Sequence, residues 1–182
     1  MSADRVRHIA AIYPGTFDPV HFGHIDIIQR SAELFGTVVV GVYDRPLKSL
    51  VFSFEDRIGL VKEAVRELGT DNVRVTGYNG LTVDFCRKVG AQVIVRGLRV
   101  FSDFEFEFRM TLANQRLAPE VQTVTLISKE QHTFLSSTTV REIASLGGDI
   151  STMVPLHVEA ALRRRFRELG GEGSVPLSQL RD

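Results

Sequence analysis

The sequence predicts a single α/β domain built on a Rossmann-like, doubly wound sheet of five parallel strands. Strand-like and helix-like patterns alternate along the 182 residues, and parallel neighbouring strands require helical crossovers. The run Thr37–Tyr43 (TVVVGVY) is almost continuously apolar and β-branched, which is typical of a strand covered on both faces. Because no repeat or linker divides the chain, we expect one domain over residues 1–169 and a flexible tail over residues 170–182.

The first expected strand is the apolar run at residues 9–13. A helix follows over residues 23–35, with one face formed by Ile25, Ile28, Ala32 and Phe35. After the second strand, Thr37–Tyr43, Ser53 is expected to cap a helix, with Asp56 three residues later in a variant of the capping box. That helix has the apolar stripe Ile58, Val61, Val65 and Leu68, and it stops at Gly69.

The second half of the chain continues the alternation. We expect strands at Val73–Tyr78, residues 91–96 and residues 121–127, with a helix over Thr82–Val89 between the first two. A longer helix covers residues 103–117 and ends before Pro119. The last helices are expected over residues 137–146 and 155–169, since Pro155 suits the first helical position.

Composition narrows the functional classes. The chain has 22 basic and 22 acidic residues, so its formal net charge is zero and nothing predicts a sequence-independent affinity for nucleic acid or membranes. The single cysteine, Cys86, excludes an internal disulfide framework and, beside Phe85, is expected to be a buried, inert thiol. No secretory leader or long apolar run is evident, which indicates a cytoplasmic protein.

The segment from Tyr13 to His24 (YPGTFDPVHFGH) contains the first candidate site. It joins the first strand to a helix N-terminus, where unpaired backbone N–H groups and a partial positive charge favour phosphate. Imidazoles donate hydrogen bonds to phosphoryl oxygens, and Gly23 permits close approach of the backbone. In sheets of this kind ligands bind beyond the carboxyl ends of the strands, which is where this segment lies.

Other functions of these residues have to be weighed. His21 and His24 have a spacing that suits a metal, but no Cys or third His completes a ligand set, so we predict no protein metal site. His24 could instead only cap the helix. Thr16 and Asp18 are turn-forming residue types, and Asp18 is interpreted mainly as an organiser of its loop.

Further candidates follow the other strands. Arg96 and Arg99 flank a turn glycine and form a potential bidentate anion clamp, although they could pair with the acidic residues Asp103, Glu105 and Glu107. The hydroxyl cluster Ser136–Thr139 either caps a helix or binds a second phosphate. The dense aromatic residues Phe101, Phe104, Phe106 and Phe108 indicate core packing or a subunit interface.

Taken together, these motifs resemble those of a known family. Gly15-Thr16-Phe17-Asp18-Pro19 with His21-Phe22-Gly23-His24 is similar to the HxGH signature of the nucleotidylyltransferase superfamily. Ser136-Ser137-Thr138 followed by Val140-Arg141 is similar to its second signature. Arg96-Gly97-Leu98-Arg99 with the segment Asp103–Glu107 resembles the bacterial phosphopantetheine adenylyltransferases in particular, and the likeness runs from about residue 9 to residue 169.

The resemblance implies transfer of AMP from ATP to 4′-phosphopantetheine, giving dephospho-coenzyme A (dephospho-CoA) and pyrophosphate, by direct in-line attack without a covalent intermediate. This is the penultimate step of coenzyme A biosynthesis. It also implies a Mg²⁺-dependent homohexamer, with Mg²⁺ held mainly by ATP phosphates and water. Because the acceptor is already an anionic phosphate, alignment and charge stabilisation are enough for catalysis.

The same resemblance implies roles for individual residues. The catalytic residues would be His24, Lys48 and Arg99. Phosphopantetheine would contact Thr16, Lys48, Thr82 and Arg96. ATP would contact Thr16, Phe17, His24, Gly97, Leu98, Arg99, Glu107, His132, Thr133, Phe134, Leu135, Ser136, Ser137 and Thr138. Two alternatives remain: a nucleotidylyltransferase with another acceptor, such as nicotinamide mononucleotide or a cytidylyl acceptor, and a non-catalytic nucleotide-binding module on the same fold.

Overall fold

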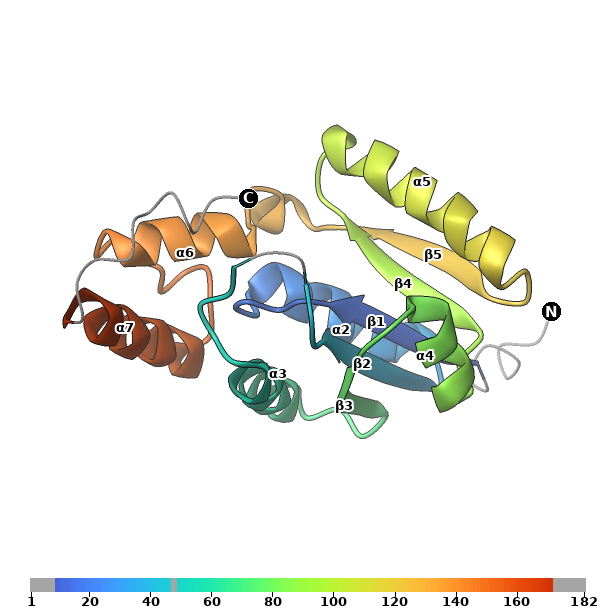
Figure 1. The fold of residues 1–182 in the computed structure, drawn as a ribbon, viewed down its shortest axis with the longest axis horizontal. Coiled ribbons are helices and arrows are strands. Elements are labelled where there is room, and N and C mark those ends of the chain that lie inside the picture. Colours follow the sequence, from blue (N-terminus) through green and yellow to red (C-terminus); the bar gives the residue numbers. More distant parts are fainter. Residues whose placement is uncertain (1–8, 47–48, 172–182) are drawn as a thin grey trace.

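The computed structural model describes residues 9–46 and 49–171, so Lys48 and the tail beyond residue 171 lie outside the described residues. Within this part of the chain, parallel strands form one sheet in the order β3-β2-β1-β4-β5 (Figure 1). They are β1 (Ala10–Gly15), β2 (Thr37–Tyr43), β3 (Val73–Tyr78), β4 (Val93–Leu98) and β5 (Gln122–Ile127). The predicted fold class, a doubly wound five-stranded parallel sheet, is confirmed.

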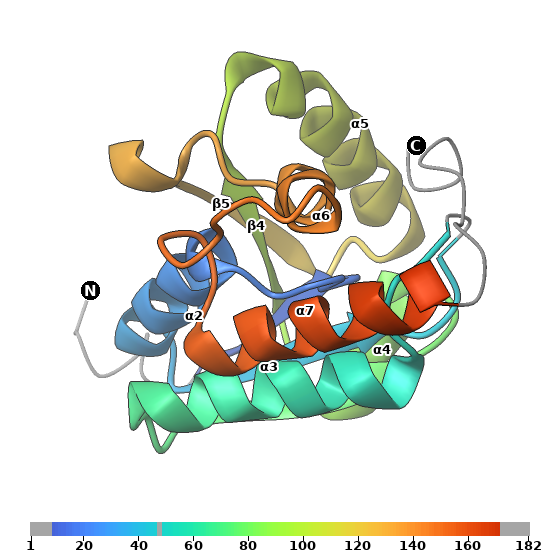
Figure 2. The same ribbon diagram turned by 90° about the vertical axis from the view of Figure 1, so that its left-hand side faces the viewer.

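Helices cover both faces of the sheet. On one face, α2 (Phe22–Leu34) packs on β2 and β4, and α3 (Phe54–Leu68) packs on β2 and β3. On the other, α4 (Thr82–Val89) packs on β1 and α5 (Phe101–Leu117) packs on β4. The chain then passes through a short 3-10 helix, η1 (Glu130–His132), to α6 (Ser137–Ser145) and α7 (Leu156–Gly171), and α7 lies alongside α3 (Figure 2).

The core explains why β1 and β2 are so apolar. Along β2, Val38, Val40 and Val42 pack into the larger core cluster, whereas Val39 points into the smaller cluster on the opposite face. Because successive side chains of a strand alternate between faces, a strand covered by helices on both sides must be apolar throughout. Helices of the described chain are too short or too polar to cross a membrane.

The expected elements agree with the structure except at some boundaries. The fourth strand was expected at residues 91–96, but β4 covers Val93–Leu98. Ala91 follows Gly90, the C-cap of α4, and its N–H donates to the carbonyl of Cys86 in that helix instead of pairing with a strand. At the other end, pairing with β5 continues through Gly97 and Leu98, so the turn glycine does not end the strand. At the other end of the described chain, α7 includes Gly170 and Gly171, which were assigned to the tail.

The cap of α3 was also predicted, with one difference. Ser53 is the N-cap residue, and its hydroxyl accepts the N–H of Asp56 at 3.1 Å. The carboxylate of Asp56 accepts from that same hydroxyl at 2.8 Å rather than from the backbone of Ser53. Gly69 ends the helix in the left-handed conformation, with φ of 63°, which glycine adopts without strain.

Candidate active site

The candidate site lies where the strand order reverses. The chain leaves β1 toward one side of the sheet and β4 toward the other, so the loops after these adjacent strands separate and leave a crevice at their carboxyl ends. Arg96 in β4 reaches across this point and donates to the carbonyl of Pro14 in β1 at 3.2 Å. The segments that carry the HxGH motif and the two arginines therefore meet at one edge of the sheet.

His21 and His24 cap α2 together. His21 is the N-cap residue, and its Nδ1 accepts the backbone N–H of His24 at 3.4 Å. In return, Nδ1 of His24 accepts the backbone N–H of His21 at 3.2 Å. The two rings stack with their centroids 3.7 Å apart. The capping role considered for His24 is therefore real, and it involves both histidines.

This capping sets the protonation of both rings. Because each Nδ1 accepts a hydrogen bond, each neutral ring carries its proton on Nε2. Burial, reinforced by the positive charges of Arg99 and Arg96, lowers the pKa of His24 to about 3. Burial and the neighbouring His24 also lower the pKa of His21 well below its usual value. Both imidazoles are thus neutral Nε2–H donors, and among the described residues no acceptor is bound to either Nε2.

One backbone amide at the start of α2 remains available to a ligand. The N–H of Phe22 donates to the carbonyl of Met153, and that of His24 is used in the cap. The N–H of Gly23 has no acceptor in the described part of the chain. A Cβ at Gly23 would lie 3.0 Å from the ring of His21, so the glycine makes room for that imidazole as well as for a ligand. The helix N-terminus presents one free amide beside two imidazole donors, which suits an anion.

The loop before α2 places Thr16 and Phe17 differently. Phe17 is a buried core residue whose ring packs edge-to-face on His24, with centroids 4.9 Å apart, so only its backbone is open to a ligand. Its φ is 53°, a conformation that side chains larger than glycine seldom adopt. Thr16 is half-buried, and its carbonyl accepts from Arg57 at 2.7 Å. The hydroxyl of Thr16 therefore remains the group of this loop best suited to contact a substrate.

Asp18 organises its surroundings, as the sequence indicated. Its carboxylate is buried and accepts the backbone N–H groups of Val51 and Phe52 at 2.9 and 3.0 Å. It also forms an ion pair with the buried Arg141 of α6, at 3.3 Å, and Arg141 donates to the Asp18 carbonyl at 2.7 Å. Asp18 thus fixes the β1–α2 loop, the segment before α3 and α6 relative to one another.

The two arginines of the expected clamp are held by carboxylates of α5. Glu107 accepts from Nε and Nη2 of Arg96 at 2.6 and 2.7 Å, a bidentate pair. Asp103 accepts from Nε of Arg99 at 3.0 Å, and Arg99 also donates to the carbonyl of Leu135 at 2.8 Å. Although burial opposes it, the Arg99 hydrogen bonds lower the pKa of Asp103. The pairing considered from the sequence is therefore present, and it orients both guanidiniums at the crevice.

The hydroxyl cluster at the start of α6 divides into separate roles. Ser136 is the N-cap, and its hydroxyl accepts the N–H of Thr139 at 3.0 Å. Ser137 donates to the carbonyl of Pro19 at 2.9 Å and so ties α6 to the β1–α2 loop. Thr138 is exposed, and the N–H groups of Ser137 and Thr138 bind no acceptor among the described residues. The start of α6 offers two free amides to a second anionic group, and the Thr138 hydroxyl, which accepts from Arg141 at 3.5 Å, still has its own proton to donate.

The segment between β5 and α6 closes the ATP side of the expected site. Gly23 lies against His132, whose Cβ would be 3.7 Å from a Cβ built on the glycine. Nδ1 of His132 is buried and has no hydrogen-bond partner. Leu135 is buried, its N–H donates to the carbonyl of His132 and its carbonyl accepts from Arg99, whereas Phe134 is exposed. Of the predicted ATP residues of this segment, His132 is thus beside the HxGH motif.

An ion cluster that the sequence did not reveal anchors this segment to α2. Asp26 is buried, and its carboxylate pairs with Lys129 at 2.9 Å and with Arg30 at 3.2 Å. Arg30 also donates to the carbonyl of Ile127 at the end of β5, at 2.7 Å. Although burial raises it, the hydrogen bonds from Lys129 and Arg30 lower the pKa of Asp26 overall. Asp26 lies on the inner face of α2 together with Ile27. From the sequence alone Asp26 would be expected to be exposed, because its side chain is charged.

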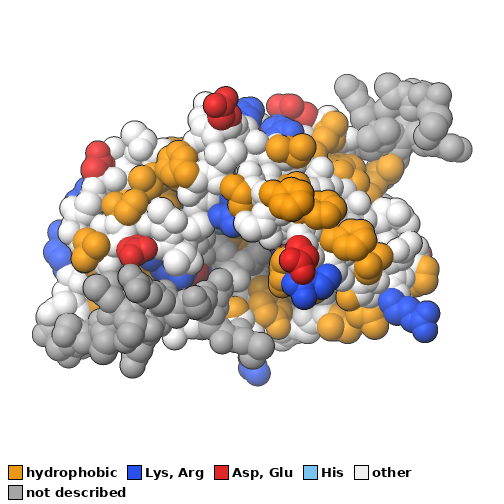
Figure 3. All heavy atoms as spheres, turned by 90° about the horizontal axis from the view of Figure 1, so that it is seen from above, with side chains coloured by type: hydrophobic (Ala, Val, Ile, Leu, Met, Phe, Trp, Pro, Cys, Tyr) orange, Lys and Arg blue, Asp and Glu red, His pale blue; other side chains and the backbone are white. Residues whose placement is uncertain are grey.

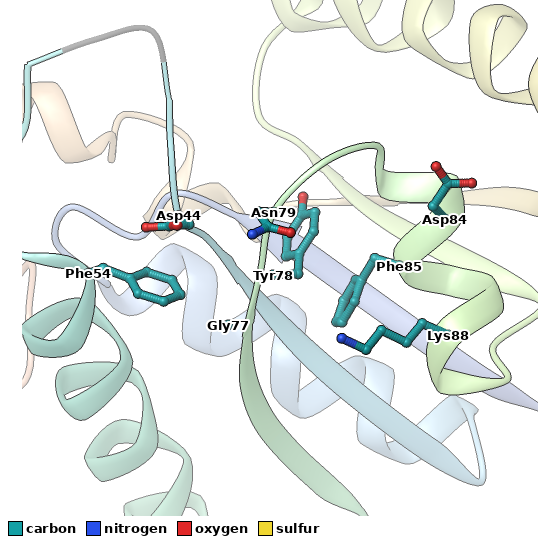
Figure 4. A pocket seen from close by; sticks show the side chains of 8 residues that line it. All are labelled: Asp44, Phe54, Gly77, Tyr78, Asn79, Asp84, Phe85 and Lys88. Atoms are coloured by element: carbon teal, nitrogen blue, oxygen red, sulfur yellow. The ribbon is translucent and has the colours of Figure 1, made fainter.

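Thr82 lies apart from the histidines, at the start of α4. Its hydroxyl is 3.2 Å from the hydroxyl of Tyr78, which lines a cavity of about 260 Å³ at the carboxyl ends of β2 and β3 (Figure 4). The cavity is lined by Asp44, Phe54, Gly77, Tyr78, Asn79, Asp84, Phe85 and Lys88. Asp44, one of the lining residues, directly follows β2 and lies four residues before Lys48 in the sequence.

Chemically, the described residues of the site present mainly hydrogen-bond donors. Neutral imidazoles, free amides at two helix N-termini, a hydroxyl at Thr16 and two oriented guanidiniums surround one edge of the sheet. The single cysteine, Cys86, is buried, and burial raises its pKa to about 12. Such an arrangement is suited to bind and stabilise phosphoryl oxygens.

Comparisons with known proteins agree with this arrangement. A model of the cytidylyltransferase-like family matches residues 12–143. A protein named phosphopantetheine adenylyltransferase from Roseiflexus sp. (strain RS-1) is 51% identical over 156 residues, which are 86% of this chain and 96% of that protein. A protein of the same name from Methylococcus capsulatus is 48% identical over 163 residues, 90% of this chain and 99% of the relative.

Solved structures share the fold at lower identity. A putative nicotinate-nucleotide adenylyltransferase from Vibrio parahaemolyticus superimposes with a TM-score of 0.69 at 22% identity, covering 88% of this chain and 96% of that one. A nicotinic acid mononucleotide adenylyltransferase from Plasmodium falciparum gives a TM-score of 0.66 at 13% identity, covering the same shares of the two chains. These likenesses support the Rossmann-like architecture.

Proposed function

This chain belongs to the phosphopantetheine adenylyltransferases of the cytidylyltransferase-like family, and we propose that it transfers AMP from ATP to 4′-phosphopantetheine, the penultimate step of coenzyme A biosynthesis. The products are dephospho-CoA and pyrophosphate. The observation that carries the proposal is the pair of neutral Nε2–H imidazoles beside the free amide of Gly23. These donors lie at the switch point of the sheet, where nucleotides bind in this architecture.

The proposed reaction is a single in-line displacement. An oxygen of the phosphopantetheine phosphate forms a bond to the α-phosphorus of ATP, while the bond from that phosphorus to the bridging oxygen breaks. Pyrophosphate leaves with the bonding electrons. Because the attacking phosphate is already an anion, no side chain has to remove a proton from it. The protein contributes alignment of the reactants and stabilisation of the charge that develops on the α-phosphoryl oxygens.

On the ATP side, we assign the α-phosphate to Nε2–H of His24, with the N–H of Gly23 beside it. Arg99 and the free amides of Ser137 and Thr138 would receive the β- and γ-phosphates. This assignment is supported by the contact of Arg99 with the Leu135 carbonyl, which places the guanidinium beside the segment leading into α6. The adenosine would lie against the remaining predicted ATP residues, Phe17, Gly97, Leu98, Glu107, His132, Thr133, Phe134, Leu135 and Ser136.

On the acceptor side, we assign the phosphate of phosphopantetheine to the hydroxyl of Thr16 and to Lys48, which lies outside the described residues. The pantetheine arm would extend toward Thr82 and Arg96. Two observations support this direction: the hydroxyls of Thr82 and Tyr78 are 3.2 Å apart, and Tyr78 lines the cavity beyond β3 (Figure 4). Donor and acceptor would then approach His24 from opposite sides of the crevice.

Mg²⁺ would enter the site together with ATP. No three His, Cys, Asp or Glu side chains of the described residues gather as a protein cation site, and Asp103 and Glu107 are engaged by arginines. This donor set fits an ion held by phosphate oxygens and water. When bound, Mg²⁺ supplies neutralisation of negative charge on the pyrophosphate leaving group.

We further propose that the chain assembles as a homohexamer in the cytoplasm. None of the described residues of α5 is buried, although the helix carries Phe101, Phe104, Phe106, Phe108, Met110 and Leu112. Apolar side chains gather on the face that includes this helix (Figure 3). Core packing within one chain therefore does not explain these rings, and an exposed apolar face of this extent is typical of a subunit interface.

The stereochemistry of transfer tests the mechanism. With ATP bearing a chiral α-thiophosphate, a single in-line displacement inverts configuration at the α-phosphorus of the dephospho-CoA analogue. A covalent adenylyl-enzyme would require two displacements and would give net retention. Inversion, together with the absence of radiolabelled protein after incubation with labelled ATP alone, is the expected result, and retention contradicts the proposal.

A further inference from the structure

The charged side chain that is most deeply buried among the described residues has been assigned no role in the site beyond its contact with Thr16. Arg57, on the inner face of α3, is 0% exposed. Its Nη1 donates to the carbonyls of Thr16 and Tyr43, both at 2.7 Å, and its Nη2 donates to the carbonyl of Asp44 at 3.2 Å. The guanidinium thus binds backbone oxygens at the carboxyl ends of β1 and β2.

No carboxylate forms an ion pair with Arg57 among the described residues. Arg141 provides a useful contrast, because it is buried to a similar degree but is paired with Asp18. Burial lowers the pKa of Arg57, yet a guanidinium remains protonated at neutral pH. Asp18, Asp44 and Glu55 act on Arg57 only through space, without direct ion pairs. The interior below the β1–α2 loop therefore contains a positive charge that no described carboxylate contacts directly, and such a charge can also stabilise an anion bound nearby.

The positions of the three carbonyls indicate which bound anion the charge of Arg57 would stabilise. Carbonyl oxygens at strand ends carry partial negative charge, and if they faced the crevice they would repel a phosphate bound there. Arg57 draws those of Thr16, Tyr43 and Asp44 toward the interior. Thr16 is assigned to the acceptor phosphate, and Asp44 lines the cavity beyond β3 toward which the pantetheine arm is proposed to extend. The residues assigned to the triphosphate come instead from the loop after β4, from α6 and from the start of α2.

We propose that Arg57 is a positioning residue for the acceptor phosphate: it holds the backbone of Thr16, Tyr43 and Asp44 at the carboxyl ends of β1 and β2 and supplies a buried positive charge beneath Thr16. This inference rests on the proposed function, since it names one half of the same site. Arg57 does not contact substrate in this account. It acts through the backbone of Thr16 and Asp44.

Steady-state kinetics of two variants test the inference. Arg57→Gln removes the charge, and we expect the KM for phosphopantetheine to rise about tenfold while the KM for ATP stays within about twofold. Arg57→Lys keeps the charge but donates from a single nitrogen, so an intermediate rise of about threefold is expected. The matched control is Arg66→Gln on the same helix, where the exposed Arg66 pairs only with Glu63; both KM values should match those of the wild-type protein.

A merely structural role for Arg57 predicts a different pattern. Loss of general packing would lower kcat or raise both KM values together, and Arg57→Lys would be no better than Arg57→Gln. Either pattern overturns the inference, as does a folded Arg57→Gln variant with wild-type KM values. If Arg57→Gln does not fold, Arg57→Lys decides alone: a selective rise in the acceptor KM supports the inference, and unchanged or equally raised values refute it.

Failure of the proposed function is distinguishable from failure of this inference. If the wild-type protein does not adenylylate phosphopantetheine but uses another phosphorylated acceptor, the proposed function is wrong. The comparison of KM values for that acceptor and for ATP then still tests Arg57. If the wild-type protein forms dephospho-CoA and the variants show no selective effect, only the role of Arg57 is wrong.

Discussion

Nδ1 of His21 accepts the backbone N–H of His24, and Nδ1 of His24 accepts the backbone N–H of His21. In most helix caps a hydroxyl or carboxylate fills this role. With imidazole, the same hydrogen bond that caps the helix N-terminus also fixes the tautomer, because the ring proton must then be on Nε2. Capping and phosphate binding are therefore not competing interpretations of His24, since the cap prepares the ring as a donor.

Substitutions of His24 can separate these two roles. Asparagine places an oxygen near the position of Nδ1 and keeps the cap, whereas glutamine places an amide nitrogen near Nε2 and keeps the donor. We expect His24→Asn to lower kcat by about 100- to 1,000-fold with little change in the Kd of ATP. His24→Gln should retain more of the turnover. Equal kcat values for His24→Asn and the wild-type protein, measured by pyrophosphate release, would contradict the donor role.

The lowered histidine pKa values predict how stability depends on pH. In the unfolded chain both imidazoles titrate near their ordinary pKa of about 6.5, whereas the folded pKa of His24 is about 3. Between these values the unfolded state binds more protons, so the free energy of unfolding falls as pH falls, by up to about 1.4 kcal/mol per pH unit for each histidine. We expect the free energy of unfolding, measured with urea from about pH 7 to about pH 4, to depend less steeply on pH for His24→Asn than for the wild-type protein. Equal dependence on pH would mean that His24 binds its proton in the folded state as readily as in the unfolded state.

The buried carboxylate of Asp26 predicts a selective effect on ATP. Asp26→Asn removes the charge that holds Lys129 and Arg30, and these residues anchor the segment between β5 and α6 to α2. We expect the KM for ATP to rise by about three- to tenfold and the KM for phosphopantetheine to stay unchanged. Glu33→Gln, at an exposed position of the same helix, is the control. A rise confined to the phosphopantetheine KM would show that this anchor serves the other half of the site.

The apolar face of α5 predicts the oligomeric state. Phe104 and Phe108 stack with their ring centroids 5.8 Å apart, and each is about half exposed. Placing glutamate at both positions should convert the proposed hexamer, measured by light scattering, into smaller species with the same helical content. Leu156→Glu is the control, since Leu156 is 81% exposed at the start of α7, away from α5. A wild-type protein that is monomeric at micromolar concentration would refute the interface.

Much of the fold was predictable because the strands are short, apolar and separated by capped helices. β2, β3 and α4 begin and end at the residues that the patterns indicate. The end of β4 was not predictable from its own residues, because Gly97 ends neither the pairing with β5 nor the strand. Strand ends depend on the neighbouring strand, and local sequence does not contain that partner.

In the candidate site, the sequence indicated the donors, the α5 carboxylates that hold the two arginines and the role of Asp18, but not the buried charges behind them. Gly23, His24, Arg96 and Arg99 are recognisable by residue type and position. Asp26 and Arg57 are charged residues on the inner faces of helices, and a charged residue type normally predicts exposure. For Arg57 a signal was present: it is four residues before Val61 and eight before Val65, so it lies on the apolar face of α3.

Acceptor choice is the most direct test of the central claim, that this chain adenylylates phosphopantetheine. The purified protein is incubated with MgATP and equal concentrations of phosphopantetheine and nicotinamide mononucleotide, and the products are identified by mass spectrometry. The account predicts dephospho-CoA and pyrophosphate in equal amounts, with no dinucleotide formed from nicotinamide mononucleotide. Formation of that dinucleotide without dephospho-CoA would contradict it.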